Sequence, residues 1–257
     1  MRDIGALVLT YNEAENISDC LASLEWVTEL VVIDSYSDDN TLDKARKYTD
    51  RIYQREFDDF ASQRNFGLEK LSTDWVLVVD ADERVTPELK SEIQRVLHEP
   101  QAEGYEIPRK NYFLGRWIKY CGWYPDYTLR LFKRENNCYS GLVHEGLDLE
   151  GEVKRLDNPL IHYTYRDLEH YLAKINHYTS LDAQKKYQAG TEKGLLYILL
   201  RPVVEFIKKY FLKKGFLLGA QGLILSVLSS YYQFLKYAKL WEKNSENSNE
   251  SKVNSDE

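Results

Sequence analysis

The sequence predicts an α/β fold in which a parallel sheet carries helices on both faces. Short apolar runs alternate with segments of helical periodicity, and polar clusters stand directly after several of the apolar runs. The chain has 257 residues, of which 43% are hydrophobic and 29% are charged. These values suit one large domain with an appendage and exclude disordered and fibrous classes.

The first half of the chain alternates between the two kinds of element. Continuous apolar runs or more polar extended runs predict strands over Ile4–Thr10, Leu30–Ile33, Arg51–Arg55, Trp75–Val79 and, further on, Thr128–Phe132. Helices are expected from Asn12, over Thr41–Tyr48, over Phe60–Leu71 and from Pro87. The first begins with a variant capping box of Asn12 and Glu15, and the last has Thr86 as its N-cap.

Three of the expected strands end in polar clusters, at residues 10–13, 34–39 and 80–83. In open α/β sheets ligands bind at the carboxyl ends of the strands, so these clusters mark a candidate site. Neither a GxGxxG turn nor a GxxxxGK[ST] loop follows the first strand, which removes the main support for a dehydrogenase or a P-loop enzyme. Asp80 and Asp82 could supply hard oxygen ligands for Mg²⁺ or Mn²⁺ bridging a diphosphate, whereas an isolated Asp-x-Asp is more often a solvated turn.

Four motifs, TYNEAENI, VVIDSYSDDNT, SQRNFG and VVDADER, occur in this order, within a resemblance that covers about residues 3–165. In combination they resemble the inverting family 2 glycosyltransferases, which have the GT-A fold, a Rossmann-like nucleotide-diphospho-sugar transferase sheet. Further similarity to bacterial lipopolysaccharide core β-1,4-glucosyltransferases lies in Gly122–Asp126, Arg130–Phe132, Val143–Gly146 and Lys236–Trp241. The similarity then extends to about residue 241.

The resemblance implies roles for residues of these motifs. It implies that uracil and ribose of a UDP-sugar are bordered by Thr10, Tyr11, Asn12, Glu13 and Asp39, with Asp34 also lining the nucleotide site. Arg64 and Asn65 would face the diphosphate. Asp80 and Asp82 would hold ribose and a Mg²⁺ or Mn²⁺ ion, with Asp82 as the direct metal ligand, and His144 is a further candidate ligand for metal or phosphate. A divalent cation would neutralise the charge that develops on the UDP leaving group.

An inverting transfer also needs a base that removes the proton of the acceptor hydroxyl. Many family members use the Asp of a Glu-Asp pair, and residues 84–194 contain no such pair. The candidates are Glu145, which lies between His144 and Gly146, and Asp126, which lies among aromatic residues that could stack on a sugar. We favour Glu145 slightly, and both candidates stay open.

Charge and hydropathy divide the chain into three parts. Residues 195–241 carry seven basic residues and one acidic residue, whereas the formal net charge of the whole chain is −7. This basic segment has apolar residues at helical spacing, Pro202 should kink or segment its first helix, and Phe216–Leu235 contains no charge. We therefore predict a GT-A catalytic domain over 1–194, membrane-associating helices over 195–241 and a disordered polar tail over 242–257.

The function implied is transfer of a sugar, glucose in the closest resemblance, from a UDP-sugar to a lipid-linked acceptor such as lipopolysaccharide inner-core heptose. The expected place is the cytoplasmic face of the bacterial inner membrane, with peripheral attachment; a helical hairpin packed on the body is the alternative for 195–241. Transfer to polyprenyl phosphate or to a peptide, a non-catalytic sugar-nucleotide-binding module and a membrane-surface scaffold are alternative functions. The acidic balance argues against nucleic-acid binding, and three cysteines without a CxxC pair favour a reducing compartment.

Overall fold

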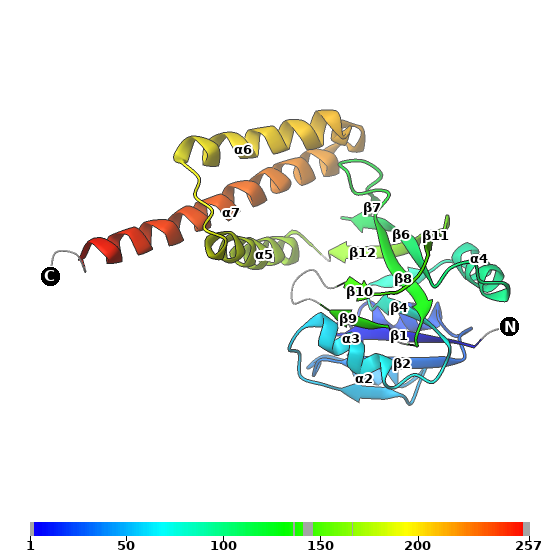
Figure 1. Cartoon of the computed structure of the whole chain (residues 1–257). Coiled ribbons are helices and arrows are strands. Elements are labelled where there is room, and N and C mark those ends of the chain that lie inside the picture. Colours follow the sequence, from blue (N-terminus) through cyan, green and yellow to red (C-terminus); the bar gives the residue numbers. More distant parts are fainter. Residues whose placement is uncertain (1–2, 136, 141–145, 166, 254–257) are drawn as a thin grey trace. The chain divides into compact units, whose positions relative to one another are not determined.

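The computed structural model describes residues 3–135, 137–140, 146–165 and 167–253, with side chains described as far as residue 246 (Figure 1). The chain divides into two compact units, one made of residues 1–110 and 125–163 and the other of residues 111–124 and 164–257. This division differs from the boundary expected at residue 194, because helix α5 (Leu168–Gln188) belongs to the second unit.

The first unit is built on a mixed sheet. Within the described residues the strand order is β3-β2-β1-β4-β8-β6-β12-β5, with β7 and β11 paired to β6. The strands are β1 (Ile4–Thr10), β2 (Glu29–Asp34), β3 (Ile52–Gln54), β4 (Trp75–Asp80), β5 (Glu83–Val85), β6 (Gly104–Phe113), β7 (Arg116–Trp117), β8 (Tyr127–Lys133), β11 (Val153–Arg155) and β12 (Leu160–Tyr165). β6 and β12 continue into the second unit, to which β7 belongs. Strands β1 to β4 are parallel, but β8 pairs antiparallel with both β4 and β6, so the expectation of a parallel sheet is wrong for this half.

Helices cover both faces of this sheet, as predicted. They are α1 (Ile17–Ala22), α2 (Thr41–Ala45), α3 (Phe60–Leu68) and α4 (Pro87–His98). Ala6 and Val8 of β1 pack in the cluster that contains the buried residues of α1 and α4, whereas Leu7 packs in the cluster of α3. A small hairpin of β9 (Cys138–Ser140) and β10 (Gly146–Asp148) adds Tyr139 to the α3 side. Because both faces are buried, β1 and β4 read as continuous apolar runs.

The helix ends follow local chemistry in one case and tertiary contacts in another. Thr86 caps α4 as predicted: its Oγ1 accepts a hydrogen bond from Leu89 N at 3.1 Å. The expected capping box at Asn12 is wrong, because Asn12 has a φ of 53° and its side-chain oxygen accepts from Asp38 N at 2.9 Å. Helix α1 therefore starts only at Ile17.

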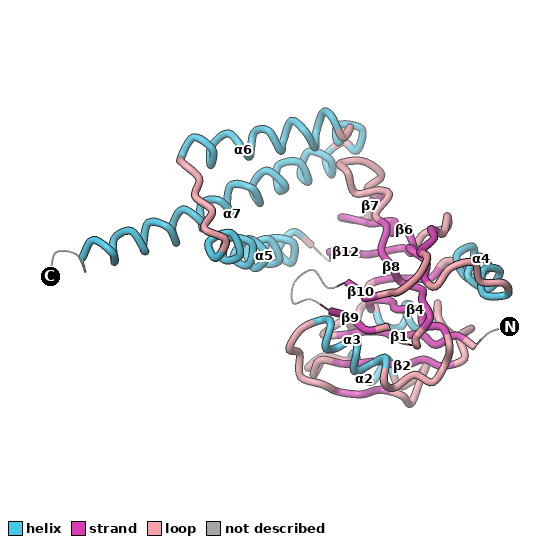
Figure 2. The backbone as a smooth tube through the Cα atoms, viewed as in Figure 1, coloured by secondary structure: helices cyan, strands magenta, loops and turns pink. Residues whose placement is uncertain are grey.

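The second unit is helical. It contains α5, α6 (Leu195–Ile207), a π-helical turn (η1, Lys208–Leu212), a 3₁₀ turn (η2, Gly215–Leu218) and α7 (Ala220–Val253). Its core includes Phe113, Tyr171 and Leu225, and Figure 2 shows its helices in cyan. A Cβ on Gly222 would lie 1.9 Å from the carbonyl oxygen of Gly215, so the close approach of these two segments requires glycine at residue 222.

Two features of the C-terminal segment bear on the predictions made for it. Helix α6 continues through Pro202, and the chain turns instead at Lys214 and Gly219, which both have positive φ. Helix α7 continues to Val253, into the part of the chain for which we predict disorder. Among the described residues, no helix combines the length and the apolar character needed to cross a membrane.

Candidate functional site

The polar strand ends of the first unit meet at one edge of its sheet. In the register of the parallel strands Thr10 lies beside Asp34, and Leu9 lies beside Asp80. The chain leaves β1 towards β2 on one side and returns as β4 on the other, so this edge is a topological switch point. The hydroxyl of Thr10 is buried there and has no hydrogen-bond partner among the described residues.

Backbone amides and side chains join the loops that follow β1 and β2. Asn12 N donates to Ser37 Oγ, and Glu13 N donates to Thr41 Oγ1, both at 2.9 Å. Asp39 accepts from Ala14 N at 3.1 Å. The structure thus brings together Asn12, Glu13 and Asp39, as the sequence predicts, and leaves the ring of Tyr11 exposed beside them.

Asp34 has a different place from the one expected. Its side chain is completely buried, and its carboxylate accepts hydrogen bonds from Ser37 N at 3.0 Å, Ser37 Oγ at 2.5 Å and Gln54 Nε2 at 3.0 Å. These bonds hold the loop after β2 in its conformation. In this structure Asp34 therefore shapes the edge from behind rather than lining its surface.

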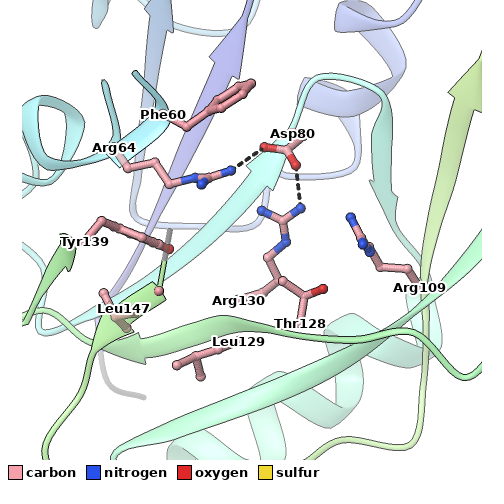
Figure 3. Close-up of a pocket in the computed structure, with 10 residues that line it drawn as sticks. Phe60, Arg64, Asp80, Arg109, Thr128, Leu129, Arg130, Tyr139 and Leu147 are labelled. Carbon is pink, nitrogen blue, oxygen red and sulfur yellow. Dashed lines mark hydrogen bonds and ion pairs between the residues drawn. The ribbon is translucent and has the colours of Figure 1, made fainter. Parts of the chain in front are cut away.

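Asp80 lies between two arginines at the end of β4, as Figure 3 shows. Its Oδ1 is 3.4 Å from Arg64 Nη2, and its Oδ2 is 2.5 Å from Arg130 Nη2. Burial opposes ionisation of Asp80, but the charges of Arg130 and Arg64 outweigh it and hold the pKa of this carboxyl well below its usual range. Asp80 is therefore a carboxylate at all physiological pH values.

A cavity of about 330 Å³ adjoins Asp80 in the first unit. Its lining includes Phe60, Arg64, Asp80, Arg109, Thr128, Leu129, Arg130, Tyr139 and Leu147, the residues labelled in Figure 3. The guanidinium of Arg64 lies 5.7 Å from the ring centroid of Phe60 and 5.2 Å from that of Tyr139. Three of the lining residues are arginines, whose guanidinium groups are suited to bind an anionic group.

Asn65, the neighbour of Arg64 in the sequence, does not share that place. Its Nδ2 donates to Tyr139 O at 2.9 Å, and its Oδ1 accepts from Tyr139 N at 2.8 Å. Both ends of the amide thus hold the β9 strand against α3. The expected contact of Asn65 with a diphosphate has no support in this arrangement, because the side chain anchors the hairpin that carries Tyr139.

Asp82 lies beside His162, for which no sequence motif indicates a role. His162 Nε2 is 3.4 Å from Asp82 Oδ2, because the antiparallel pairing of β12 with β5 sets His162 opposite Glu83. Among the described residues no group of three or more His, Cys, Asp or Glu side chains could hold a metal ion. Asp82 and His162 nevertheless offer a carboxylate oxygen and an imidazole nitrogen side by side, which fits a Mg²⁺ or Mn²⁺ ion that also binds substrate oxygens. His144 lies outside the described residues.

Of the two candidate bases, Glu145 also lies outside the described residues. Asp126 precedes β8, and its Oδ2 accepts from Arg109 Nε at 2.9 Å and from Arg109 Nη2 at 2.7 Å. Arg109 in turn lines the cavity next to Asp80. One oxygen of the Asp126 carboxylate thus accepts two charge-assisted hydrogen bonds from Arg109.

A buried carboxylate links these arginines. Glu83 Oε1 is 2.7 Å from Arg130 Nη2 and 3.6 Å from Arg109 Nη1, and Glu83 Oε2 accepts from Asp80 N at 3.0 Å. No local sequence pattern indicates a role for Glu83 or Arg109. The two arginines that contact Glu83, Arg109 and Arg130, lie on β6 and β8. Nothing in the local sequence shows that these strands pass beside the turn that follows Asp80.

An order of β3-β2-β1-β4 followed by an antiparallel β8, with an Asp-x-Asp turn at the end of β4, defines an α/β fold of GT-A type. The chain belongs to glycosyl transferase family 2, whose model matches residues 6–144. It is therefore a glycosyltransferase.

Relatives extend over nearly the whole chain. The lipopolysaccharide core biosynthesis glycosyltransferase LpsC of Rhizobium meliloti (strain 1021) is 28% identical over 93% of this chain and 92% of its own length. The uncharacterized glycosyltransferase RT0209 of Rickettsia typhi is 25% identical over 94% of this chain and 88% of its own length. Among solved structures, S. aureus TarS 1–349 in complex with UDP-GlcNAc aligns with a TM-score of 0.48 at 14% identity, covering 95% of this chain and 92% of that one.

Proposed function

We propose that the protein transfers glucose from UDP-glucose, with inversion at the anomeric carbon, to a heptose of the lipopolysaccharide inner core. The observation that supports this most is the similarity to LpsC, a lipopolysaccharide core biosynthesis glycosyltransferase, along 93% of this chain. The similarity includes the helical second unit as well as the sheet. A lipid-linked acceptor would account for the presence of a helical second unit in addition to the sheet that binds the donor.

The donor binds at the carboxyl edge of β1, β2 and β4. The uridine lies against the joined loops after β1 and β2, where Tyr11 offers an exposed ring for stacking and Asp39 offers carboxylate oxygens. Asp80, kept ionised by its arginines, accepts from the ribose hydroxyls. Arg64 lies at the cavity wall and pairs with the diphosphate.

Asp82 and His162 would hold a divalent cation, Mg²⁺ or Mn²⁺. When bound, such an ion neutralises the negative charge that develops on the leaving UDP. Asp82, in the turn between β4 and β5, and His162, on β12, lie within 3.4 Å of each other, so that both side chains can reach one ion. His144 remains an alternative ligand.

Asp126 is the base in this proposal. It takes the proton of the acceptor hydroxyl while the hydroxyl oxygen bonds to the anomeric carbon, and the bond from that carbon to the diphosphate oxygen breaks with its electron pair going to UDP. We favour Asp126 because Arg109 holds its carboxylate beside the cavity that contains Asp80. Glu145 is the alternative base.

The test is incubation with a panel of radiolabelled UDP-sugars and separate acceptors. We expect label from UDP-glucose in truncated lipopolysaccharide that ends in heptose, and none in polyprenyl phosphate or peptide. Transfer to either of these instead would overturn the acceptor proposal. UDP binding without transfer or donor hydrolysis would mean a non-catalytic module, and no UDP binding at all would favour a scaffold.

The second unit supports a further part of the proposal, namely that the enzyme works on the cytoplasmic face of the bacterial inner membrane. Helix α6 and the turn η1 expose a continuous series of large apolar side chains: Leu195, Leu196, Leu199, Leu200, Val203, Val204, Ile207, Phe211 and Leu212. Leu196 and Leu212 are 70% and 73% exposed. Apolar patches of this extent mark interaction surfaces.

The charges around this apolar face favour a lipid surface as its partner. Lys208, Lys213 and Lys214 are exposed at its end, whereas Glu205 is buried and paired with Arg201 at 3.3 Å. Lys209, which the sequence groups with the other lysines, turns inward and donates to Cys121 O at 2.9 Å. The face is thus apolar with a positive border, which complements an anionic lipid surface and would repel a second copy of itself.

Vesicle sedimentation tests the surface. Replacing Lys208, Lys213 and Lys214 by Gln should weaken binding to vesicles that contain an anionic phospholipid, and Leu196→Gln with Leu212→Gln should weaken it further. Leu172→Gln, an exposed leucine on α5, serves as the control and should leave binding unchanged. Wild-type protein that never sediments with the vesicles, or that forms dimers lost in the leucine variants, would overturn this assignment.

A further inference from the structure

We propose that Glu83 is a positioning residue of the transfer reaction: it fixes the guanidinium of Arg109, and Arg109 in turn fixes the carboxylate of Asp126. This inference rests on the proposed role of Asp126 as the base. It assigns a role to a buried side chain that contacts neither substrate. It also gives a reason for the chain of ion pairs that runs from Glu83 through Arg109 to Asp126.

The carboxylate of Glu83 is fully buried and held on both oxygens. Its side chain is 0% exposed. Oε1 is 2.7 Å from Arg130 Nη2, and Oε2 accepts a hydrogen bond from the backbone N–H of Asp80 at 3.0 Å. A side chain anchored in this way by β4 and β8 has one orientation, and the same Oε1 lies 3.6 Å from Arg109 Nη1.

Arg109 transmits this orientation because a guanidinium is planar and rigid. Its Nη1 lies towards Glu83, while Nε and Nη2 on the opposite edge both donate to Asp126 Oδ2. The ion pair at 3.6 Å attracts Nη1 towards Glu83, and this attraction helps to keep Nε and Nη2 directed at Asp126 Oδ2. Strand pairing supports the same contact, since Arg109 N donates to Asp126 O at 2.9 Å.

The negative charge of Glu83 has a function that a neutral side chain of the same shape cannot supply. Arg109 and Arg130 both approach Glu83, and Arg130 is only 4% exposed. Without the carboxylate, two cations would face each other in a region of low dielectric, and the more exposed one would move away. Arg109, at 22% exposure, would be the one to move towards solvent, and Asp126 would then lose the two bonds from Arg109.

The substitution Glu83→Gln removes the charge and keeps the shape. We expect kcat to fall about 10²-fold, the scale of loss when a reacting group is displaced by about 1 Å. The dissociation constant of UDP should change less than about threefold, because Asp80 keeps both of its arginines. A purely structural role predicts the opposite pattern, namely a lower thermal stability with kcat unchanged in the folded protein.

Glu92→Gln is the matched control. Glu92 is also a buried carboxylate of the first unit, and it accepts from Asp157 N and Asn158 N, far in the sequence from the candidate base. We expect this variant to lose stability without a change in kcat. Equal losses of kcat in the two variants would mean that any buried carboxylate matters equally, and would overturn the proposal.

A double-variant cycle separates the relay from independent effects. If Glu83 acts through Arg109, then Arg109→Lys should lower kcat as much as Glu83→Gln, and the double variant should lose no more than about twofold beyond either single variant. Losses that multiply, or a Glu83→Gln enzyme with wild-type kcat, would overturn the proposal. Should Glu83→Gln fail to fold, Arg109→Lys alone decides: a wild-type kcat overturns it, and a loss of kcat with unchanged UDP affinity supports it.

Asp126→Asn distinguishes failure of the relay from failure of the proposed base. If Asp126→Asn is inactive while Glu83→Gln and Arg109→Lys are fully active, only the positioning role is wrong. If Asp126→Asn keeps its activity, the base lies elsewhere, and both the base assignment and the relay that depends on it are refuted.

Discussion

Removal of the Arg130 side chain should destabilise the first unit strongly, because this guanidinium is the shared partner of two carboxylates. In the variant Arg130→Met, Glu83 keeps the hydrogen bond from Asp80 N and the longer contact to Arg109. Among the described residues, the remaining ion-pair partner of Asp80 is Arg64. Methionine replaces much of the volume, so the loss is electrostatic rather than a cavity. Leaving a buried partner without its charge costs about 3–5 kcal/mol.

The magnitude can be divided between the two contacts. The bond to Glu83 is fully buried, and a charge-assisted hydrogen bond of this kind contributes about 1.5–3 kcal/mol. The bond to Asp80 contributes less, since Asp80 is 29% exposed and water screens it. We therefore expect about 3 kcal/mol at pH 7, towards the lower end of the range for a broken buried pair.

Urea unfolding followed by tryptophan fluorescence measures this loss. The control is Lys133→Met on the same strand, since the pair of Lys133 with Glu103 is exposed and should contribute at most about 1 kcal/mol.

The loss of stability in Arg130→Met should also depend on pH. Because the native pKa of Asp80 is depressed by Arg130 and Arg64, its ionisation stabilises the fold above the unfolded value of about 4, and this stabilisation is lost as pH falls below that value.

In Arg130→Met the pKa of Asp80 is lowered less than in the wild type, because the charge of Arg130 is lost and that of Arg64 remains. The difference in stability between variant and wild type should therefore shrink as the pH falls below about 4. A variant within about 1 kcal/mol of wild type at pH 7 would refute the reasoning, because it would show that the buried carboxylates do not depend on Arg130. A difference that is independent of pH would refute the assignment of the effect to Asp80.

Three further outcomes are expected. Asp82→Asn and His162→Ala should each abolish most of the transfer activity with an unchanged melting temperature, and excess chelator should do the same; full activity in chelator would show that the reaction needs no divalent cation. Asp126→Asn should lower kcat by about 10²–10⁴-fold, whereas Glu145→Gln should not; the reverse order would make Glu145 the base. Gly222→Ala should destabilise the second unit by at least about 1–3 kcal/mol, because the added Cβ would overlap the carbonyl of Gly215. Gly194→Ala, which has open space at its Cβ, should have a small effect. Equal melting temperatures of the two variants, measured by circular dichroism, would contradict the close approach of Gly222 and Gly215.

The buried strands and the edge of the sheet could be read from local patterns. Ile4–Thr10 and Trp75–Val79 are continuous apolar runs because both faces of the sheet are covered, and the structure places β1 and β4 over the same residues to within one position. The polar clusters after these runs meet at one edge for the same reason, since parallel strands end on the same side. The helix cap at Thr86 involves residues three positions apart, so it can also be predicted from the local sequence.

The short helices were less predictable. Asn12 carries every local signal of a helix start, yet its side chain bonds to the loop after β2 and its backbone takes a left-handed conformation. Pro202 carries the signal of a helix break, but α6 continues through it. In both cases contacts with segments distant in the sequence outweigh local propensity, which is worth about 1–3 kcal/mol at most.

Local sequence patterns are enough to predict the family, the strands that form the centre of the sheet, and the acidic turn from Asp80 to Glu83. The charges that surround this turn depend on the tertiary structure. Arg109, Arg130 and His162 come from β6, β8 and β12, and the antiparallel pairing of these strands, not their local sequence, brings them to Asp80, Asp82 and Glu83. Hydrophobic periodicity indicates whether a residue is buried. Which charged residues form ion pairs depends instead on the register of the strands, and that register depends on contacts over the whole fold.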